Sequence, residues 1–205
     1  MLLLILGVAI FLGVHTVTTL RGARRSMMEA IGEGPYKGLY SLASLIGLAL
    51  IVYGFKSYRD AGYIQVWDPP AGMRHLTILL MWFSIVSLMS GYAPGAIQRR
   101  LKHPMLVAVK IWALAHLLAN GDLGSLILFG SFLAWAVYDR IAVKRRGEAV
   151  SPGGEIAAAH AEPGPKAGAA GGMRNDVITV VAGTAVFVAL IFLHPYLIGV
   201  PVLSR

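Results

Sequence analysis

Residues 102–122 read KHPMLVAVKIWALAHLLANGD. This apolar run is typical of a segment that lies in a lipid bilayer, yet it includes His103, Lys110 and His116. Ionisable side chains are costly in hydrocarbon, and where they occur they commonly have a function. The stretch therefore predicts a membrane protein, and it also predicts side chains with a chemical role inside the membrane.

The composition of the whole chain agrees with a membrane protein. Of its 205 residues, 57% are hydrophobic and only 14% are charged, whereas a soluble domain carries about 25% charged residues. The chain contains no cysteine. This excludes disulfides, thiolate metal ligands and iron–sulfur clusters.

Six apolar segments are each close to the roughly 20 residues that a bilayer requires. They are 1–20, 38–55, 75–93, 104–119, 123–139 and 177–199. We therefore predict an all-α fold, a polytopic membrane bundle of six transmembrane helices. The first segment has neither a basic region before it nor a small-residue cleavage site after it, so we expect a retained helix. The segment 104–119 is short and carries Lys110, so we expect its neighbours to shield it from lipid.

Lysines and arginines in the connections predict the orientation. The first, third and fifth connections hold 13 of the 18 basic residues. We therefore expect these connections in the cytoplasm and both termini outside it. The net charge of +8 is then an orientation signal, and we expect no nucleic-acid partner.

Two connections are rich in glycine and proline. The segment 147–175 has few large apolar residues and predicts a disordered cytoplasmic linker. It separates a membrane domain, residues 1–146, from the sixth helix and tail, residues 176–205. The segment GEGPYKG (32–38) follows no predicted strand, so we interpret it as a turn into the second helix rather than a phosphate-binding loop.

Two histidines lie inside predicted helices. His15, in FLGVHTVTTLRG (11–22), is too deep to reach water readily. It either bonds a carbonyl of an adjacent helix or binds a metal or cofactor. His116 lies 13 residues after His103, roughly 140° around the helix and about 20 Å along it. These two cannot bind one metal; His103 instead shares a face with Lys110 near the cytoplasmic edge.

His15 and His116 would have to face each other at similar depth to hold one haem iron between them. Measured from Arg24 and Lys102 at the cytoplasmic edge, their depths differ by about 7 Å, which helix tilt can absorb. His194, toward the outer end of the last helix, is the alternative partner for His116. Carboxylates are absent from the helix centres, since Asp122 and Asp139 lie at helix ends, so we expect no paired-carboxylate site.

Three stretches resemble the NnrU family of bacterial membrane proteins, which is similar in turn to the plastid 15-cis-zeta-carotene isomerases. They are GVHTVTTLRG (13–22), YKGLYSLASLIGLALIVYGF (36–55) and KHPMLVAVKIWALAHLLANGD (102–122). The resemblance covers residues 1–145 and the last helix. It implies a multi-pass protein of the bacterial inner (cytoplasmic) membrane that is linked to nitrite and nitric oxide reduction in denitrification.

The resemblance also implies a cofactor. The related isomerases hold haem b between two histidines, in motifs that match the surroundings of His15 and His116 here. They carry a cysteine three residues before the second histidine, where this chain has Ala113. A cysteine that exchanges as a ligand therefore cannot carry over.

Our first hypothesis is a haem b protein with His15 and His116 as axial ligands. Lys110 and Arg21 would pair with the haem propionates, and Trp112 and His103 would also contact the cofactor. A ligating histidine normally donates its other ring nitrogen to a neighbouring acceptor, and the candidates are Thr19 and Asn120. The partners implied are the lipid bilayer and either denitrification enzymes or an apolar polyene.

Three other functions are compatible with the sequence. One is a cis-trans isomerase of a polyene such as a carotenoid, which would make the protein a haem-dependent enzyme. Another is a non-catalytic accessory membrane protein whose histidines serve only packing. The third is a methyltransferase that uses S-adenosylmethionine, because KHPMLVAV (102–109) resembles the Arg-His-Pro motif of such enzymes and places His103 at the cytoplasmic edge. The acidic–basic motif of those enzymes is not evident in YDRIAVKRRGE (138–148).

Overall fold

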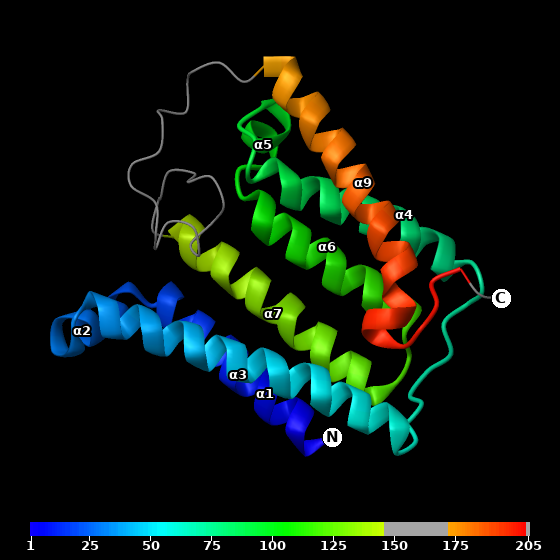
Figure 1. The fold of residues 1–205 in the computed structure, drawn as a ribbon, viewed down its shortest axis with the longest axis horizontal. Helices are drawn as coiled ribbons and strands as arrows, with labels where there is room; N and C mark the ends of the chain where they lie inside the picture. The colour runs from blue at the N-terminus through cyan, green and yellow to red at the C-terminus, as the bar shows by residue number, and fades with distance from the viewer. Residues whose placement is uncertain (146–171, 204–205) are drawn as a thin grey trace. The chain divides into compact units, whose positions relative to one another are not determined.

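The computed structural model describes residues 1–145 and 172–203. In these residues helices are the regular structure, and one isolated bridge joins Gln65 to Asp122. The helices (Figure 1) are α1 (Leu2–Thr19), α2 (Arg21–Ile31), α3 (Glu33–Asp60), α4 (Met73–Ser90), α5 (Ala96–Leu101), α6 (Pro104–Ala119), α7 (Leu123–Arg145) and α9 (Gly172–Ile198). The predicted all-α fold is confirmed.

Five helices are long and apolar enough to cross a membrane, namely α1, α3, α4, α7 and α9. By the length and composition of these helices, the chain is a multi-pass membrane protein. The sixth predicted segment forms α6, which has 16 residues. At 1.5 Å per residue α6 is about 24 Å long, which is less than the roughly 30 Å of a hydrocarbon core.

The helix ends differ from the predictions where polar residues extend a helix beyond its apolar part. Helix α3 begins at Glu33, directly after Gly32 with φ 87°, so the predicted turn at 32–38 is confined to its first residue. The predicted linker lies mostly in residues 146–171, outside the described residues. Helix α9 begins at Gly172, so the last four residues assigned to the linker belong to this helix. Helices α2 and α5 were not predicted, because neither is an apolar segment.

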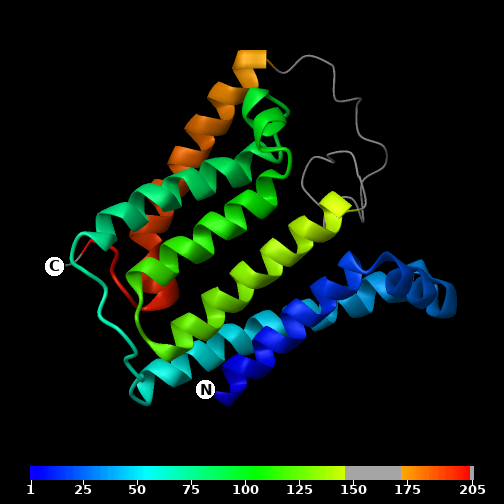
Figure 2. The same ribbon diagram turned by 180° about the vertical axis from the view of Figure 1, so that it is seen from behind.

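The chain forms two compact units, and the first comprises Met1–Pro70 with His116–Glu148. Its centre is the crossing of α1 and α3, which lie side by side in opposite views (Figures 1 and 2). A Cβ added at Gly7 would lie 2.6 Å from the backbone nitrogen of Ile51, and one added at Gly47 would lie 2.8 Å from that of Phe11. A Cβ at Gly54 would overlap the backbone nitrogen of Leu4. These glycines let the two backbones approach closely, as small residues do in membrane helix pairs.

Helix α7 packs against α1 in the same unit. Three side-chain pairs join them: Phe11 with Phe132 (ring centroids 5.5 Å apart), His15 with Trp135 (5.8 Å) and Thr19 with Asp139 (a 2.8 Å hydrogen bond). Residue numbers rise together along both helices, so α1 and α7 run parallel. The glycine contacts of α1 and α3 run in opposite order, so those two helices are antiparallel.

The second unit comprises Ala71–Ala115 with Ala149–Arg205. Hydroxyls of α4 bind the backbone of α6, since Ser84 Oγ donates to the Ala108 carbonyl at 2.8 Å and Thr77 Oγ1 donates to the Ala115 carbonyl at 2.9 Å. Helix α9 packs on α4. Its Asp176 carboxylate accepts hydrogen bonds from the backbone nitrogens of Ala96 and Ile97 at 2.9 and 3.0 Å, which stabilises the start of α5.

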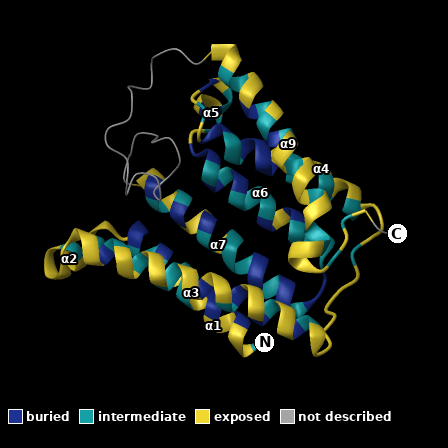
Figure 3. Cartoon of the chain, in the orientation of Figure 1, coloured by how far each residue is buried: buried dark blue, intermediate teal, exposed yellow. Residues whose placement is uncertain are grey.

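Large apolar side chains are exposed along whole faces of the spanning helices (Figure 3). On α3 and α9 these include Leu42, Leu45, Val52, Val181 and Phe192. A soluble protein rarely exposes contiguous apolar patches larger than a few hundred Å². The exposed faces therefore fit contact with lipid chains.

Candidate functional site

His15 lies in the first unit inside a group of aromatic rings. The ring of Phe11, one turn earlier on α1, stacks on it with centroids 4.2 Å apart. Tyr40 of α3 lies at 5.5 Å, and Trp135 of α7 meets the imidazole edge-on at 5.8 Å. The imidazole is buried. Three helices thus fix its position and surround it with flat apolar walls.

One hydrogen bond fixes how the His15 ring is protonated. Its Nδ1 lies 2.6 Å from the carbonyl oxygen of Phe11. A carbonyl only accepts hydrogen bonds, so Nδ1 carries the proton and the neutral ring has its lone pair on Nε2. A ring nitrogen with a free lone pair, oriented by a hydrogen bond from the other nitrogen to a backbone carbonyl, is the usual form of a metal-binding histidine.

His116, near the end of α6, also belongs to the first unit. Its ring stacks on Phe129 of α7 with centroids 4.5 Å apart and an angle of 22° between the planes. Asn120 is the predicted acceptor for the other nitrogen of this ring. Its amide nitrogen donates to the backbone carbonyl of His116 at 2.8 Å, which stabilises the end of the helix.

A row of aromatic side chains on α7 contacts both histidines. Phe129, Phe132 and Trp135 follow one another at intervals of three residues, so each ring is a neighbour of the next, and the first and last project about 120° apart around the helix. His116 lies against the first of these rings and His15 against the last. Their contact points are six residues apart, about 9 Å along the helix axis. The depth difference predicted from residue numbers, about 7 Å, is similar.

A buried carboxylate lies one turn beyond this row. Asp139 is 1% exposed, and its Oδ1 accepts a hydrogen bond from Thr19 Oγ1 at 2.8 Å. Thr18 and Thr19 also donate to the backbone carbonyl of His15, at 2.6 and 3.3 Å. The bond between Thr19 and Asp139 joins the end of α1 to α7, and the other two lie within α1. The sequence placed Asp139 only at a helix end; its spacing of four residues from Trp135 was the signal that it shares the face of the aromatic row.

Two buried donors near His15 have no hydrogen-bond partner among the described residues. They are the indole Nε1 of Trp135 and the hydroxyl of Tyr36, which lies one turn before Tyr40 on α3. An unsatisfied buried polar group costs about 1–3 kcal/mol. Both groups can donate, and the indole can only donate. This part of the unit is therefore suited to a ligand that carries hydrogen-bond acceptors.

The predicted cationic residues lie in both units. Arg21 begins α2 and, with Arg24, Arg25, Met28, Glu29 and Glu33, lines an open hollow of about 440 Å³. Lys110, Trp112 and His103 belong to the second unit. His103 is buried directly before Pro104, the first residue of α6. Its backbone nitrogen donates to the Leu101 carbonyl at 2.7 Å across a γ-turn, in which Lys102 has φ 62°.

His194, the alternative partner for His116, lies in the second unit near the end of α9. Its Nδ1 is 2.6 Å from the carbonyl oxygen of Val200. This bond lies within the last residues of the chain and stabilises the turn after α9.

The donor set of the first unit suits a haem better than a bare metal ion. Among the described residues, no three histidine or carboxylate groups come together as a metal site. Haem iron needs only axial protein ligands, because the porphyrin supplies the remaining ones. An imidazole with its lone pair on Nε2, aromatic walls and unsatisfied donors for propionate oxygens fit such a group.

A comparison with known protein families matches residues 3–202 to the family described as NnrU protein. The match covers nearly the whole chain. No curated protein and no solved structure matches.

Proposed function

The chain belongs to the NnrU family, and from this premise we propose that it is an integral membrane protein that holds one haem b between His15 and His116. The observation that carries the proposal is the orientation of the His15 ring. Its Nδ1 donates to the Phe11 carbonyl, and the ring is enclosed by aromatic side chains from α1, α3 and α7.

The side chains of the site would serve haem binding in different ways. His15 and His116 would hold the haem iron, and the bond between Thr19 and Asp139 positions His15 by joining α1 to α7. Trp135 Nε1 and the Tyr36 hydroxyl donate to propionate oxygens, because nothing else among the described residues satisfies them. Arg21 would neutralise propionate charge. Lys110, Trp112 and His103 lie in the second unit, so their contact with the cofactor stays a prediction from the sequence.

The histidine pair favours electron transfer over chemistry on a substrate. Haem b, held by His15 and His116, would supply a one-electron redox centre there, with both protein ligands already provided by histidine. Ala113, at the position of the cysteine in the related isomerases, is fully buried and has no side chain that binds iron. We therefore propose a role in nitrite and nitric oxide reduction, in the bacterial inner membrane, rather than polyene isomerisation.

We further propose six membrane crossings, with both termini outside the cytoplasm. The parallel direction of α1 and α7 supports this topology. If α3 and α4 were the only helices to cross the membrane between α1 and α7 along the chain, α7 would run antiparallel to α1. A third crossing, which α6 provides, makes them parallel. The short length of α6 is compatible with this if His103 and Asn120 lie in the interfaces, where the bilayer thins locally around short helices.

Alkaline phosphatase fusions test this topology. The enzyme is active only outside the cytoplasm, so a fusion after Leu203 is expected to be active and a fusion after Arg145 inactive. An inactive fusion after Leu203, with the full-length fusion present in the membrane, would refute the sixth crossing. A fusion after Asp60 is the matched positive control.

The absorption spectrum of purified protein tests the cofactor. Protein expressed with sufficient haem and purified from membranes should show a Soret band, and its reduced pyridine haemochrome should be that of haem b at about one haem per chain. Protein that is folded and monodisperse but has no absorption beyond its aromatic band would refute haem binding. It would favour an accessory protein whose histidines serve packing.

A further inference from the structure

Helix α2 is the one helix of the first unit with no buried residue. It lies between two spanning helices and is joined to them by single residues, Leu20 before it and Gly32 after it. Both of its ends are therefore held where α1 ends and α3 begins. A short helix tied in this way to two spanning helices remains on the side of the membrane at which α1 ends.

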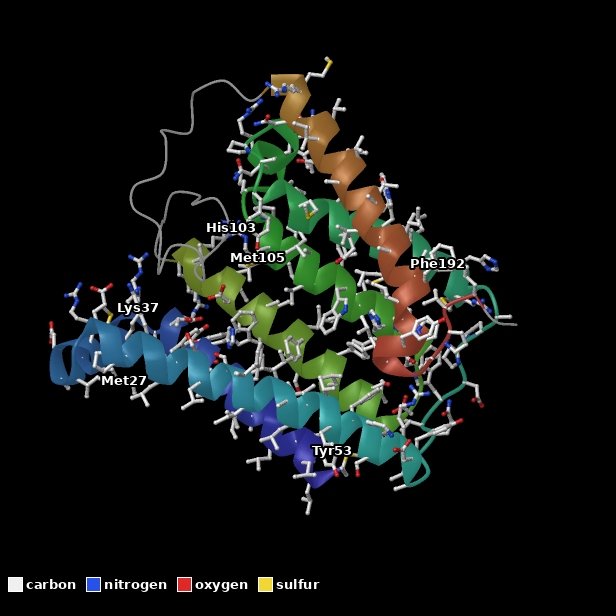
Figure 4. The ribbon with its side chains drawn as sticks, in the orientation of Figure 1. Met27, Lys37, Tyr53, His103, Met105 and Phe192 are labelled. Atoms are coloured by element: carbon white, nitrogen blue, oxygen red, sulfur yellow. The ribbon has the colours of Figure 1, made fainter. Side chains whose placement is uncertain are left out.

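One side of α2 is apolar and exposed. Leu20, Met27 and Ile31 are 47%, 46% and 45% exposed. Spacings of seven and four residues place these three side chains on one side of the helix. Figure 4 shows Met27 projecting from the opposite side of the ribbon to Lys37, the basic residue of the first turns of α3. Unpaired apolar side chains of this size at a membrane surface are suited to enter the acyl-chain region.

The two arginines lie at different directions around α2. Arg25 projects about 160° away from Met27, whereas Arg24 lies at the edge of the apolar stripe, about 60° from Met27 and about 20° from Ile31. Both line the hollow of about 440 Å³, and the Arg24 Nε is buried with no hydrogen-bond partner among the described residues. Three arginines and two glutamates line the hollow, and one of these glutamates, Glu33, forms a salt bridge with Lys37 at 2.6 Å.

We propose that α2 lies in the membrane interface and binds the phosphate group of an anionic phospholipid through Arg24 and Arg25. Met27, Leu20 and Ile31 insert between the acyl chains beside the bound headgroup. Guanidinium groups suit this site because their forked donors match phosphate oxygens. The apolar stripe and the attachment to α1 and α3 favour a lipid over free phosphate. The proposal does not depend on haem.

Site-directed spin labelling tests the position of α2. The chain has no cysteine, so Met27→Cys and, on the opposite side, Arg25→Cys each carry one nitroxide in protein reconstituted into phosphatidylglycerol–phosphatidylcholine nanodiscs. The Met27 label is expected to be relaxed mainly by oxygen and the Arg25 label mainly by a water-soluble nickel complex. If the nickel complex reaches both labels, or neither reagent reaches the Met27 label, α2 does not lie in the interface.

Lipid titration tests the headgroup site. Detergent-solubilised protein is titrated with short-chain phosphatidylglycerol, and Arg24→Gln/Arg25→Gln should bind it roughly 30-fold more weakly than the wild type, at about 1 kcal/mol per arginine. The matched control is Arg99→Gln/Arg100→Gln, an exposed pair on α5, which should bind normally. Equal loss in both double variants, equal binding of phosphatidylcholine by the wild type, or competition by inorganic phosphate at similar concentration would overturn the proposal.

Discussion

Replacement of Gly54 by leucine is expected to prevent assembly of the first unit. A Cβ at this position overlaps the Leu4 backbone nitrogen and lies 2.7 Å from the Leu3 carbonyl carbon. Overpacking against movable side chains costs typically about 1–3 kcal/mol. Backbone atoms cannot move aside unless α1 and α3 separate, so we expect at least about 3 kcal/mol. Thermal unfolding in detergent, followed by tryptophan fluorescence, measures this loss.

Gly38→Leu provides the matched control. Gly38 lies in the same helix as Gly54, and a Cβ added there meets nothing within 4 Å. This variant should unfold near the wild-type temperature. Equal stability of the Gly54→Leu and Gly38→Leu proteins would contradict the close crossing of α1 and α3.

Replacement of either axial histidine by alanine is expected to remove the haem. Even the hydrogen-bond partners of metal-binding histidines typically contribute roughly 10–100-fold to affinity, so loss of a ligand should lower the haem-to-protein ratio at least about tenfold. Both His15→Ala and His116→Ala should show this loss in the absorption spectrum of purified protein. Circular dichroism and gel filtration of the same samples separate loss of the ligand from loss of the fold.

Two other histidines make this experiment selective. His75, exposed at the start of α4, is the control, and His75→Ala should keep the full spectrum. His194→Ala should also keep it, because the His194 ring bonds the Val200 carbonyl in the turn after α9. If His194→Ala abolished the haem absorption and His15→Ala left it unchanged, the ligand would be His194 and not His15.

The helices with apolar cores were predictable from the sequence because hydrophobicity alone marks them. The bounds of α6 agree fully, since Pro104 starts it and Asn120 with Gly121 ends it. Helix α2 was not predicted because its arginines interrupt any apolar segment. The predicted segment begins at residue 38, whereas α3 begins at Glu33. The polar residues Glu33 and Lys37 lie outside any apolar segment, yet their salt bridge stabilises the helix.

The site was predictable only in part. Hydrophobic context singles out His15 and His116, because an imidazole inside an apolar segment is rare. Trp135 and Asp139 were missed because their contacts join residues 120 positions apart, and one sequence does not report which helix faces pair. The side chains of Trp135 and Tyr36 also look ordinary in the sequence; only burial without a hydrogen-bond partner distinguishes them.

The electron paramagnetic resonance spectrum of the oxidised protein at low temperature tests most directly whether two imidazoles share one iron. Two histidine ligands make ferric haem low-spin, so we expect a low-spin spectrum for the wild type. Any haem retained by His15→Ala or His116→Ala should be high-spin. A high-spin wild type, or a low-spin signal that both variants keep unchanged, would contradict ligation of one iron by His15 and His116.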